Sequence, residues 1–223
     1  MLADHILFID AEAIVLDKPA GLPVDAPRDG SLSLENHLAS LTFGFRRWPL
    51  AVHRLDRDTS GCLLLARNPK AHKRFQQAFE AGQIDKSYLA VVEGVPAGDA
   101  GAIDLPLLKI SSQQAGWRMR GDAKGKAART KWSVIDRKGG RALILFEPET
   151  GRTHQIRVHA AEALGTPIVG DPVYGRSGEP MLLHAWRLTV PRLSKAAITA
   201  EAPLPERFDV AGFTLAGAAN VPA

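Results

Sequence analysis

The chain has 223 residues, 45% of them hydrophobic and 23% charged, a balance ordinary for a globular protein that can bury a core. No run of about 18 apolar residues occurs, and the first residues lack the basic and apolar regions of a signal peptide. The single cysteine, Cys62, excludes an internal disulfide framework and a multi-cysteine zinc site. These features predict a cytoplasmic protein that does not enter a membrane.

The net charge of +4 conceals an uneven distribution of charge along the chain. Residues 46–74 contain eight Lys and Arg against two acidic residues, and residues 109–141 contain ten against two. The rest of the chain carries ten basic and twenty acidic residues. Two basic blocks on an otherwise acidic molecule favour a polyanionic ligand such as RNA, DNA or a phosphorylated metabolite, although scattered solvated charges would give the same counts.

Short apolar runs at residues 6–9 and 13–16, on either side of a turn, predict the first two strands. Residues 18–23 contain two prolines and a glycine, which predicts a stiff loop. Lys18 in this loop could contact a phosphate of a ligand or could simply be solvated. Residues 33–41 place apolar residues at helical spacing, with Ser33 as their N-cap.

The stretch around which the chain is organised is residues 53–61, His-Arg-Leu-Asp-Arg-Asp-Thr-Ser-Gly. It lies between apolar runs that are expected to be buried strands, and these would hold the loop rigidly. The positive charges of Arg54 and Arg57 flank Asp56 and favour its ionised form. A surface turn with a solvated ion pair is the alternative from this stretch alone.

A helix is predicted after this loop, with Asn68 as its N-cap, a proline at its first position and Gly82 at its end. Lys73 lies off its apolar face. Residues 84–92 then predict a strand that carries Tyr88, a residue type that more often serves packing than chemistry in this context.

Residues 94–126 are rich in Gly, Ala and Lys and predict a basic hairpin or a flexible loop. Residues 121–127 superficially resemble a phosphate-binding P-loop. Only three residues separate the glycines, however, and an alanine follows the lysine, so a nucleotide site is rejected. Strands are expected over 127–134 and 142–146.

A second stretch, Glu-Thr-Gly-Arg-Thr-His-Gln-Ile-Arg-Val-His at residues 149–159, predicts a helix of about eleven residues with Thr153 as its N-cap and Gly165 as its stop. His154 and His159 are five residues apart, whereas a helical pair of metal ligands prefers four. We therefore expect no metal site here.

Three cations crowd the beginning of this helix, namely Arg152, His154 and Arg157. The positive end of the helix dipole disfavours cations at this position unless an anion lies opposite them. Such a local conflict tends to mark a functional site. Either Asp56 or a phosphate would supply the anion.

The remaining chain predicts strand-like segments at 167–169 and 182–186 with a turn at 170–172, and a poorly ordered tail. No internal repeat or change of composition forces a domain boundary, which indicates a single domain over residues 1–210 and a tail over 211–223. Many strands, few helices and little alternation between them predict an α+β fold on a largely antiparallel sheet.

Taken together, these stretches resemble the RluA family of pseudouridine synthases over roughly residues 6–190. The long motifs at 53–61 and 151–159 are specific in combination, while the short Lys-Pro and Lys-x-Tyr elements are weak alone. The matching segments, in the family's order, are 18–21, 53–61, 86–88, 151–159, 170–175 and 183–185.

The resemblance implies isomerisation of uridine to pseudouridine in RNA, with neither a cofactor nor a metal. It implies a mixed, mainly antiparallel sheet with flanking helices and a central RNA-binding cleft. The family's catalytic aspartate falls on Asp56, which could act as a nucleophile or as a base at the 2′ carbon. Tyr88 matches the tyrosine that stacks on the uracil, and Arg157 the arginine that pairs with the catalytic carboxylate. Arg54 matches the residue that replaces the flipped base.

The two basic blocks would supply further contacts to RNA. The residues assigned to RNA contacts, with Arg54, are Arg57, Arg152, His154, Lys18 and Lys73. Because the matching pattern begins by residue 6, we expect no separate N-terminal RNA-binding domain. The substrate would then be a tRNA, a stem-loop of large-subunit ribosomal RNA, or both, bound by a monomer that has no protein partner.

Two other activities would use the same residues. One is a non-catalytic protein that binds or remodels RNA in the same cleft. The other is an N-glycosidase in which Asp56 cleaves the base without rejoining it. The complete set of Asp56, Tyr88 and Arg157 argues against the first of these.

Overall fold

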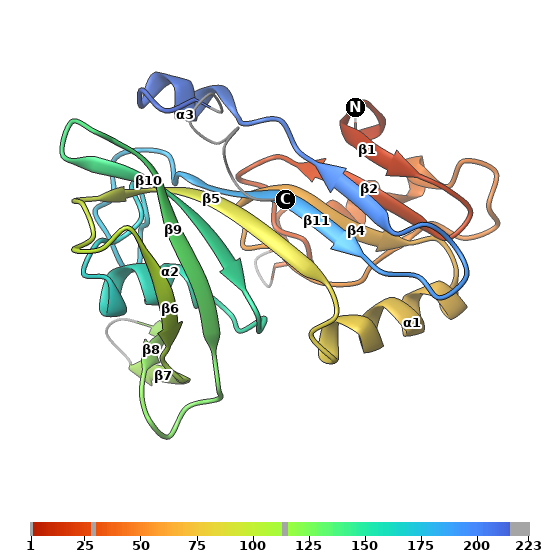
Figure 1. Ribbon diagram of the computed structural model, residues 1–223. Helices are drawn as coiled ribbons and strands as arrows, with labels where there is room; N and C mark the ends of the chain where they lie inside the picture. Colours follow the sequence, from red (N-terminus) through yellow and green to blue (C-terminus); the bar gives the residue numbers. More distant parts are fainter. Residues whose placement is uncertain (1, 28–29, 113–115, 215–223) are drawn as a thin grey trace. The chain divides into compact units, whose positions relative to one another are not determined.

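The computed structural model describes residues 2–27, 30–112 and 116–214 (Figure 1). The chain divides into two compact units. Unit 1 comprises Met1–Lys86 and Ala185–Pro203, and unit 2 comprises Ser87–His184 and Leu204–Ala223. The chain passes between the units three times. Two of these crossings fall inside strands, β5 (Asp85–Glu93) and β11 (Leu183–Val190), and the third follows Pro203.

Unit 1 is built on antiparallel strands. Strand β2 pairs with both β1 and β4, β12 pairs with β11, and the short β3 pairs with β4. The strands predicted near residues 6–9, 13–16 and 62–66 are thereby confirmed. The apolar run before residues 53–61 forms only a two-residue strand, and the expectation that it is buried is wrong for Leu50, which is 48% exposed. Besides β11, their bounds are β1 (Ile6–Ile9), β2 (Ala13–Lys18), β3 (Leu50–Ala51), β4 (Ser60–Ala66) and β12 (Ile198–Glu201).

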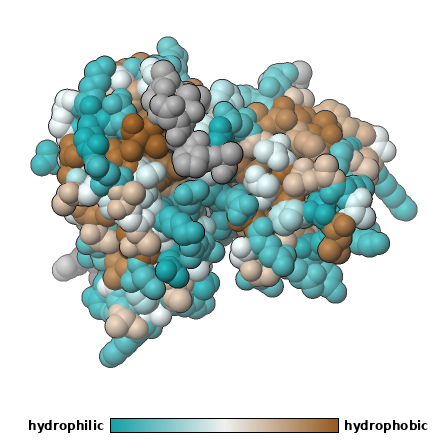
Figure 2. All heavy atoms as spheres, viewed as in Figure 1, coloured by the Kyte–Doolittle hydropathy of each residue, from teal (hydrophilic) through white to brown (hydrophobic). Residues whose placement is uncertain are grey.

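Helix α1 (Pro69–Glu80) covers this unit's core and begins and ends as predicted. The Asn68 carboxamide oxygen accepts a hydrogen bond from the Ala71 N–H at 2.9 Å, and Gly82 follows the helix with a φ of 67°. Phe75 lies on the buried face of α1, within an apolar cluster that includes Leu64 and Leu188. On the molecular surface, hydrophilic side chains are interspersed with apolar ones (Figure 2).

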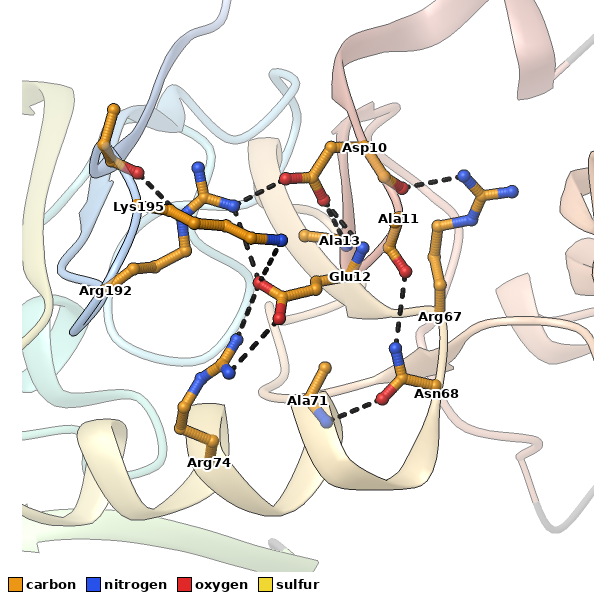
Figure 3. Close-up of polar contacts among 11 residues, drawn as sticks. Asp10, Ala11, Glu12, Ala13, Arg67, Asn68, Ala71, Arg74, Arg192 and Lys195 are labelled. Carbon is orange, nitrogen blue, oxygen red and sulfur yellow. Dashed lines mark hydrogen bonds and ion pairs between the residues drawn. The ribbon is translucent and has the colours of Figure 1, made fainter.

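A network of charged side chains joins the β1–β2 turn of unit 1 to α1 and to the loop after β11 (Figure 3). Glu12 forms ion pairs with Arg74 at 2.9 Å, Lys195 at 3.5 Å and Arg192 at 3.6 Å. Arg192 also pairs with Asp10. The hydrogen bond and the charge of Arg74 hold the pKa of Glu12 below its usual value. Arg74, although it belongs to the first basic block, therefore serves the fold.

Unit 2 contains a four-stranded antiparallel arrangement in the order β5-β10-β9-β6. A separate antiparallel hairpin is formed by β7 and β8, so the segment expected to be a hairpin or a flexible loop is a hairpin. The bounds of these strands, besides β5, are β6 (Ala100–Asp104), β7 (Leu107–Ser112), β8 (Gly116–Gly121), β9 (Arg129–Lys138) and β10 (Arg141–Pro148).

The helix predicted from Thr153 begins later than expected. Helix α2 spans Gln155–Val158 and continues as a π-helical turn, His159–Ala163, and its N-cap is His154. The side chain of Gln155 explains the shift, because its amide oxygen accepts the Arg152 N–H at 2.9 Å and its amide nitrogen donates to the Arg129 carbonyl at 2.9 Å. The chain before the helix is thus fastened to β9, and Thr153 as N-cap is wrong.

The remaining elements are short. They are the 3₁₀ helices Leu2–His5 and Leu34–Leu41, the second preceded by Ser33, and helix α3 (Glu206–Val210). Residues 167–169 form only an isolated bridge, Ile168 with Val92, in place of the expected strand. The fold is α+β with mainly antiparallel strands, as predicted. In the part of the chain that the structure describes, no helix is long and apolar enough to cross a membrane.

Two expectations on domain organisation stay predictions. The first is a single catalytic domain over residues 1–210. The second is the poorly ordered tail, since residues 215–223 lie outside the described ones.

Gly61 provides a test of the packing that positions the loop before β4. Its φ is +106°, and a Cβ atom there would lie 2.2 Å from the Ala185 carbonyl oxygen. We expect Gly61→Ala to lower the free energy of unfolding by about 3 kcal/mol or more, because backbone strain and overpacking add. Urea unfolding followed by circular dichroism measures this.

The matched control is Gly44→Ala, which has a φ of +82° and no atom within 4 Å of the added Cβ. Strain alone predicts a loss of about 1 kcal/mol for this variant. Equal losses in the two variants would contradict a role for the close approach to Ala185.

Candidate active site

Asp56 lies in the loop between β3 and β4 of unit 1. The Thr59 N–H donates to the Asp56 carbonyl at 3.1 Å and closes a turn, and Thr59 and Ser60 are buried. Leu55 is buried as well, whereas Asp56 is half-buried. The alternation of inward and outward residues thus anchors the loop in the core and leaves the Asp56 carboxylate partly accessible.

Lys18 is the anchor of this loop. Its side chain is fully buried, and its ammonium group donates to the carbonyl oxygens of Pro19 and Leu22, both at 2.8 Å, and of Arg57 at 3.1 Å. The Gly21 N–H donates to the same Arg57 carbonyl at 2.9 Å. The assignment of Lys18 to RNA contacts is therefore wrong. A buried charge needs several acceptors, and two carbonyls of the 18–23 loop and one carbonyl next to Asp56 supply them.

His53 orders its neighbours and does not carry charge at neutral pH. Its Nε2 accepts the Leu64 N–H at 3.0 Å, and its ring stacks on Phe79 with centroids 4.5 Å apart. Desolvation, aided by the positive charge of Lys86, lowers the pKa of His53 to about 3. The neutral ring thus joins the start of the Asp56 loop to β4.

Three further arginines of the first basic block have partners within the protein. Arg54 forms an ion pair with Asp25, and Arg57 with Asp58 at 3.1 Å. Both arginine side chains are about two-thirds exposed, with 66% and 65% of their surface accessible, so these pairs are weak and exchangeable. Arg67, in contrast, is buried and donates to three backbone carbonyls. Of the residues assigned to RNA in this unit, Lys73 is simply exposed on α1.

In unit 2 the central feature is a buried ion pair. Arg157, on α2, donates from Nε and Nη2 to the two carboxylate oxygens of Asp171, at 2.7 and 2.8 Å. Asp171 also accepts the N–H groups of Val173 and Tyr174. Burial alone would raise the pKa of Asp171, but the Arg157 contact and these backbone donors outweigh it, and the pKa is lowered.

Asp171 is thus an anionic partner of Arg157 that the sequence analysis missed, since only Asp56 or a phosphate was considered there. A signal was present, because Asp171 lies in the segment 170–175 that carries part of the family resemblance. The turn is tightly built. Gly170 has a φ of +72°, and a Cβ atom there would lie 2.4 Å from the Pro180 carbonyl oxygen.

Tyr174 extends this site toward the β7–β8 hairpin. Its ring lies 5.2 Å from the Arg157 guanidinium carbon, and its hydroxyl accepts the Met119 N–H at 2.9 Å. The same hydroxyl lies 2.9 Å from Nδ1 of His154. Arg157, Asp171, Tyr174 and His154 therefore form one connected cluster within unit 2.

Tyr88 and Arg152 are the other predicted site residues in this unit. Tyr88, on β5, lies opposite Phe146 of β10 and is half-buried against the unit's apolar core. Arg152 is exposed, although its Nε donates to the Ala127 carbonyl at 2.9 Å. The roles assigned to Asp56, Tyr88 and Arg157 stay predictions. Among the described residues, no three His, Cys, Asp or Glu side chains gather as a metal site would require.

Known proteins are similar to this chain in sequence and in fold. A family model described as RNA pseudouridylate synthase matches residues 12–162. An uncharacterised RNA pseudouridine synthase of Zymomonas mobilis is 62% identical over 217 residues, covering 96% of this chain and 99% of that protein. Ribosomal large subunit pseudouridine synthase C of Yersinia pestis is 40% identical over 174 residues, covering 78% of this chain and 54% of that protein.

The solved structure of human RNA pseudouridylate synthase domain containing 4 superposes with a TM-score of 0.79 at 27% identity, covering 93% of this chain and 91% of that one. The chain belongs to the RNA pseudouridine synthases, isomerases that act on RNA. The RluA-family resemblance is confirmed.

The anchoring role of Lys18 can be tested with Lys18→Met, which keeps much of the side chain's volume but removes three hydrogen bonds. We expect a loss of about 3 kcal/mol in the free energy of unfolding, because three carbonyls lose a charged donor. Urea unfolding measures this loss. Lys73→Met, on the surface of α1, is the control and should unfold like the wild type. Equal stability of the two variants would contradict the anchor.

His53 predicts a dependence of stability on pH. A histidine with a pKa of about 6.5 unfolded and about 3 folded takes up a proton mainly on unfolding. Its contribution is therefore complete above pH 6.5 and is lost progressively as the pH falls toward 3.

His53→Gln keeps an acceptor for the Leu64 N–H but does not titrate. Between pH 6 and 4 the unfolding free energy of the wild type should fall by about 1.4 kcal/mol per pH unit more than that of the variant. Chemical unfolding at each pH gives the two slopes. Parallel curves would show that His53 is protonated in the folded protein.

Proposed function

We propose that this pseudouridine synthase isomerises a uridine in a stem-loop of large-subunit ribosomal RNA or of a tRNA, with Asp56 as the essential residue. The observation that carries the proposal is the construction of the Asp56 loop. Lys18, Gly21 and His53 fasten the backbone on both sides of Asp56, while Asp56 as a whole is only half-buried. A rigid frame around an accessible carboxylate is what a positioned catalytic group needs.

The reaction rearranges the nucleoside without changing its composition. The bond between the sugar C1′ and uracil N1 breaks, the base turns, and C1′ bonds to C5. The proton on C5 is released, and N1 gains one. Asp56 either attacks the sugar as a nucleophile or removes a proton from the 2′ carbon, and both routes need an ionised carboxylate.

Tyr88 and Arg157 are proposed, from the resemblance alone, as the stacking partner of the uracil and the cation of the catalytic carboxylate. The half-buried position of Tyr88 on β5 supports the first role, because one part of a packed ring can meet a base. The two hydrogen bonds from Arg157 to Asp171 support the second, because they give the guanidinium a fixed orientation.

The target base must leave its helix, which costs a few kcal/mol. Arg54 is proposed to take the place of the flipped base, and its exposed pair with Asp25 is weak enough to open. Arg57, Arg152, His154 and Lys73 are proposed as further contacts to RNA. All are at least partly exposed.

The choice of substrate rests on the relatives. The relative from Yersinia pestis is named for the large ribosomal subunit, which favours a ribosomal stem-loop. This chain covers 54% of that protein. We propose that the exposed basic residues of this chain recognise the RNA. A tRNA substrate, alone or in addition, uses the same chemistry. We further propose that the protein is located in the cytoplasm and acts as a monomer. Light scattering tests the monomer, because the measured mass should equal the chain mass of 24.0 kDa.

Pseudouridine mapping tests the function. Total RNA from cells with and without this gene is compared, and the purified protein is incubated with transcripts of the sites that change. We expect loss of one or a few pseudouridines in a ribosomal or tRNA loop, restored by the wild type. Asp56→Asn should lower the rate by at least about 10³-fold, because it removes the carboxylate's charge, while RNA affinity is kept.

Other outcomes would contradict the proposal. An unchanged map with inactive purified protein would leave only RNA binding. Strand scission at abasic sites would indicate cleavage of the base without rejoining. Full activity of Asp56→Asn would remove Asp56 from the chemistry.

A further inference from the structure

The β7–β8 hairpin of unit 2 carries a large aromatic side chain on its surface. Trp117 lies on β8 and is 48% exposed. The ring of His154 stacks against it, with centroids 5.2 Å apart and planes inclined by 27°. The ammonium nitrogen of Lys109, on β7, lies 4.9 Å from the centre of the indole ring. The partly exposed indole thus has a stacked imidazole ring and a cation that lies over its ring.

The backbone and the hydrogen bonds of His154 hold this arrangement in place. His154 has a φ of 54°, a left-handed conformation that is uncommon for a residue other than glycine. Its ring also contacts Tyr174 edge-on, with centroids 5.6 Å apart, and Nδ1 bonds to the Tyr174 hydroxyl. Backbone strain at a residue that is locked in this way tends to mark a functional position.

The packing of the hairpin does not require Trp117. The side chains of Trp117 and Met119 lie on the same face of β8, because they are two residues apart. Met119 is the buried one, in an apolar cluster with Leu107, Ala128 and Val158. Trp117 is outside this cluster and keeps about half of its surface accessible. About half of the indole is therefore available for contact with a ligand.

The charge around the hairpin indicates the class of ligand. Residues 109–141 carry ten basic and two acidic residues. One of these acidic residues, Asp122, pairs with Arg120. Arg118, Lys124 and Lys126 are exposed. A flat aromatic surface within a field of positive charge matches a nucleobase with its phosphate, since bases stack on aromatic rings and Lys or Arg bind the backbone.

We propose that Trp117, supported by His154 and flanked by Lys109, is a stacking platform for an unpaired base of the RNA substrate, distinct from the uridine that reacts. This inference rests on the proposed function, because it assigns a second contact to the same substrate. The platform selects RNA with a single-stranded loop, since a base inside a duplex has no free face to offer. Tyr174 contacts both His154 of the platform and Arg157, and so connects the platform to Arg157.

Binding is measured in the Asp56→Asn background, so that no turnover occurs. The probes are a fluorescently labelled RNA stem-loop and the same stem as a blunt duplex. Trp117→Ala should weaken binding of the stem-loop about tenfold and leave binding of the duplex unchanged, because only the loop offers a base to stack. Trp117→Phe should restore most of the affinity. Trp48→Ala is the matched control, since Trp48 is also exposed, at 56%, but lies in unit 1.

The dependence of binding on salt separates stacking from charge. Trp117→Ala should keep the wild-type slope of log Kd against log salt, because a stacked base releases no counterion. Lys109→Met should reduce that slope by about one. In the active protein, Trp117→Ala should raise KM for the mapped RNA with kcat nearly unchanged. Circular dichroism and the urea midpoint verify that each variant is folded.

Three results would overturn the platform. They are wild-type affinity of Trp117→Ala for the stem-loop, an equal loss for stem-loop and duplex, and an equal loss in Trp117→Ala and Trp48→Ala. Any of these in a protein that makes pseudouridine defeats the platform and leaves the proposed function intact. Selective loss of stem-loop binding in a protein that makes no pseudouridine supports the platform and defeats the proposed function.

Discussion

A buried ammonium group is the constraint on which unit 1 depends. Lys18 ends β2 inside the core, where an uncompensated charge would cost several kcal/mol. Three backbone carbonyls compensate it, and one of them belongs to Arg57, next to Asp56 in the chain. If the loop moved away, the ammonium group would lose the Arg57 carbonyl as an acceptor while it remained buried in the core. The position of Asp56 is therefore tied to the stability of the unit.

Unit 2 also depends on buried charge, here an ion pair. Arg157 and Asp171 are buried together, and Asp171 is further held by two backbone N–H groups in a turn that begins with Gly170. Breaking such a pair leaves a buried charge without a partner, which is strongly unfavourable. The pair therefore specifies geometry more than it adds stability. In each unit, part of a family motif is held by a buried charge and its hydrogen-bond partners. Losing those partners would leave the charge buried and unpaired.

The number of basic residues alone overstated the surface available to RNA. In the first block, Arg67 and Arg74 are used by the fold, through three backbone carbonyls and through Glu12. The charges that are left for RNA are the exposed ones, such as Arg54 and Arg57, whose ion pairs can exchange. Net charge along a chain indicates a class of ligand, whereas the accessibility of each charge decides which residues can meet it.

The sequence by itself determined the family, the mainly antiparallel α+β fold and the ends of α1, because motif spacing, alternation of apolar residues and capping residues are local signals. It also marked Asp56 and Arg157 as candidate site residues. Only the tertiary structure decided that Lys18 is buried, that Asp171 is a partner of Arg157, and that Gln155 delays the start of α2. Those outcomes depend on contacts between residues up to 39 positions apart, and no local pattern encodes which acceptor a charged side chain will reach.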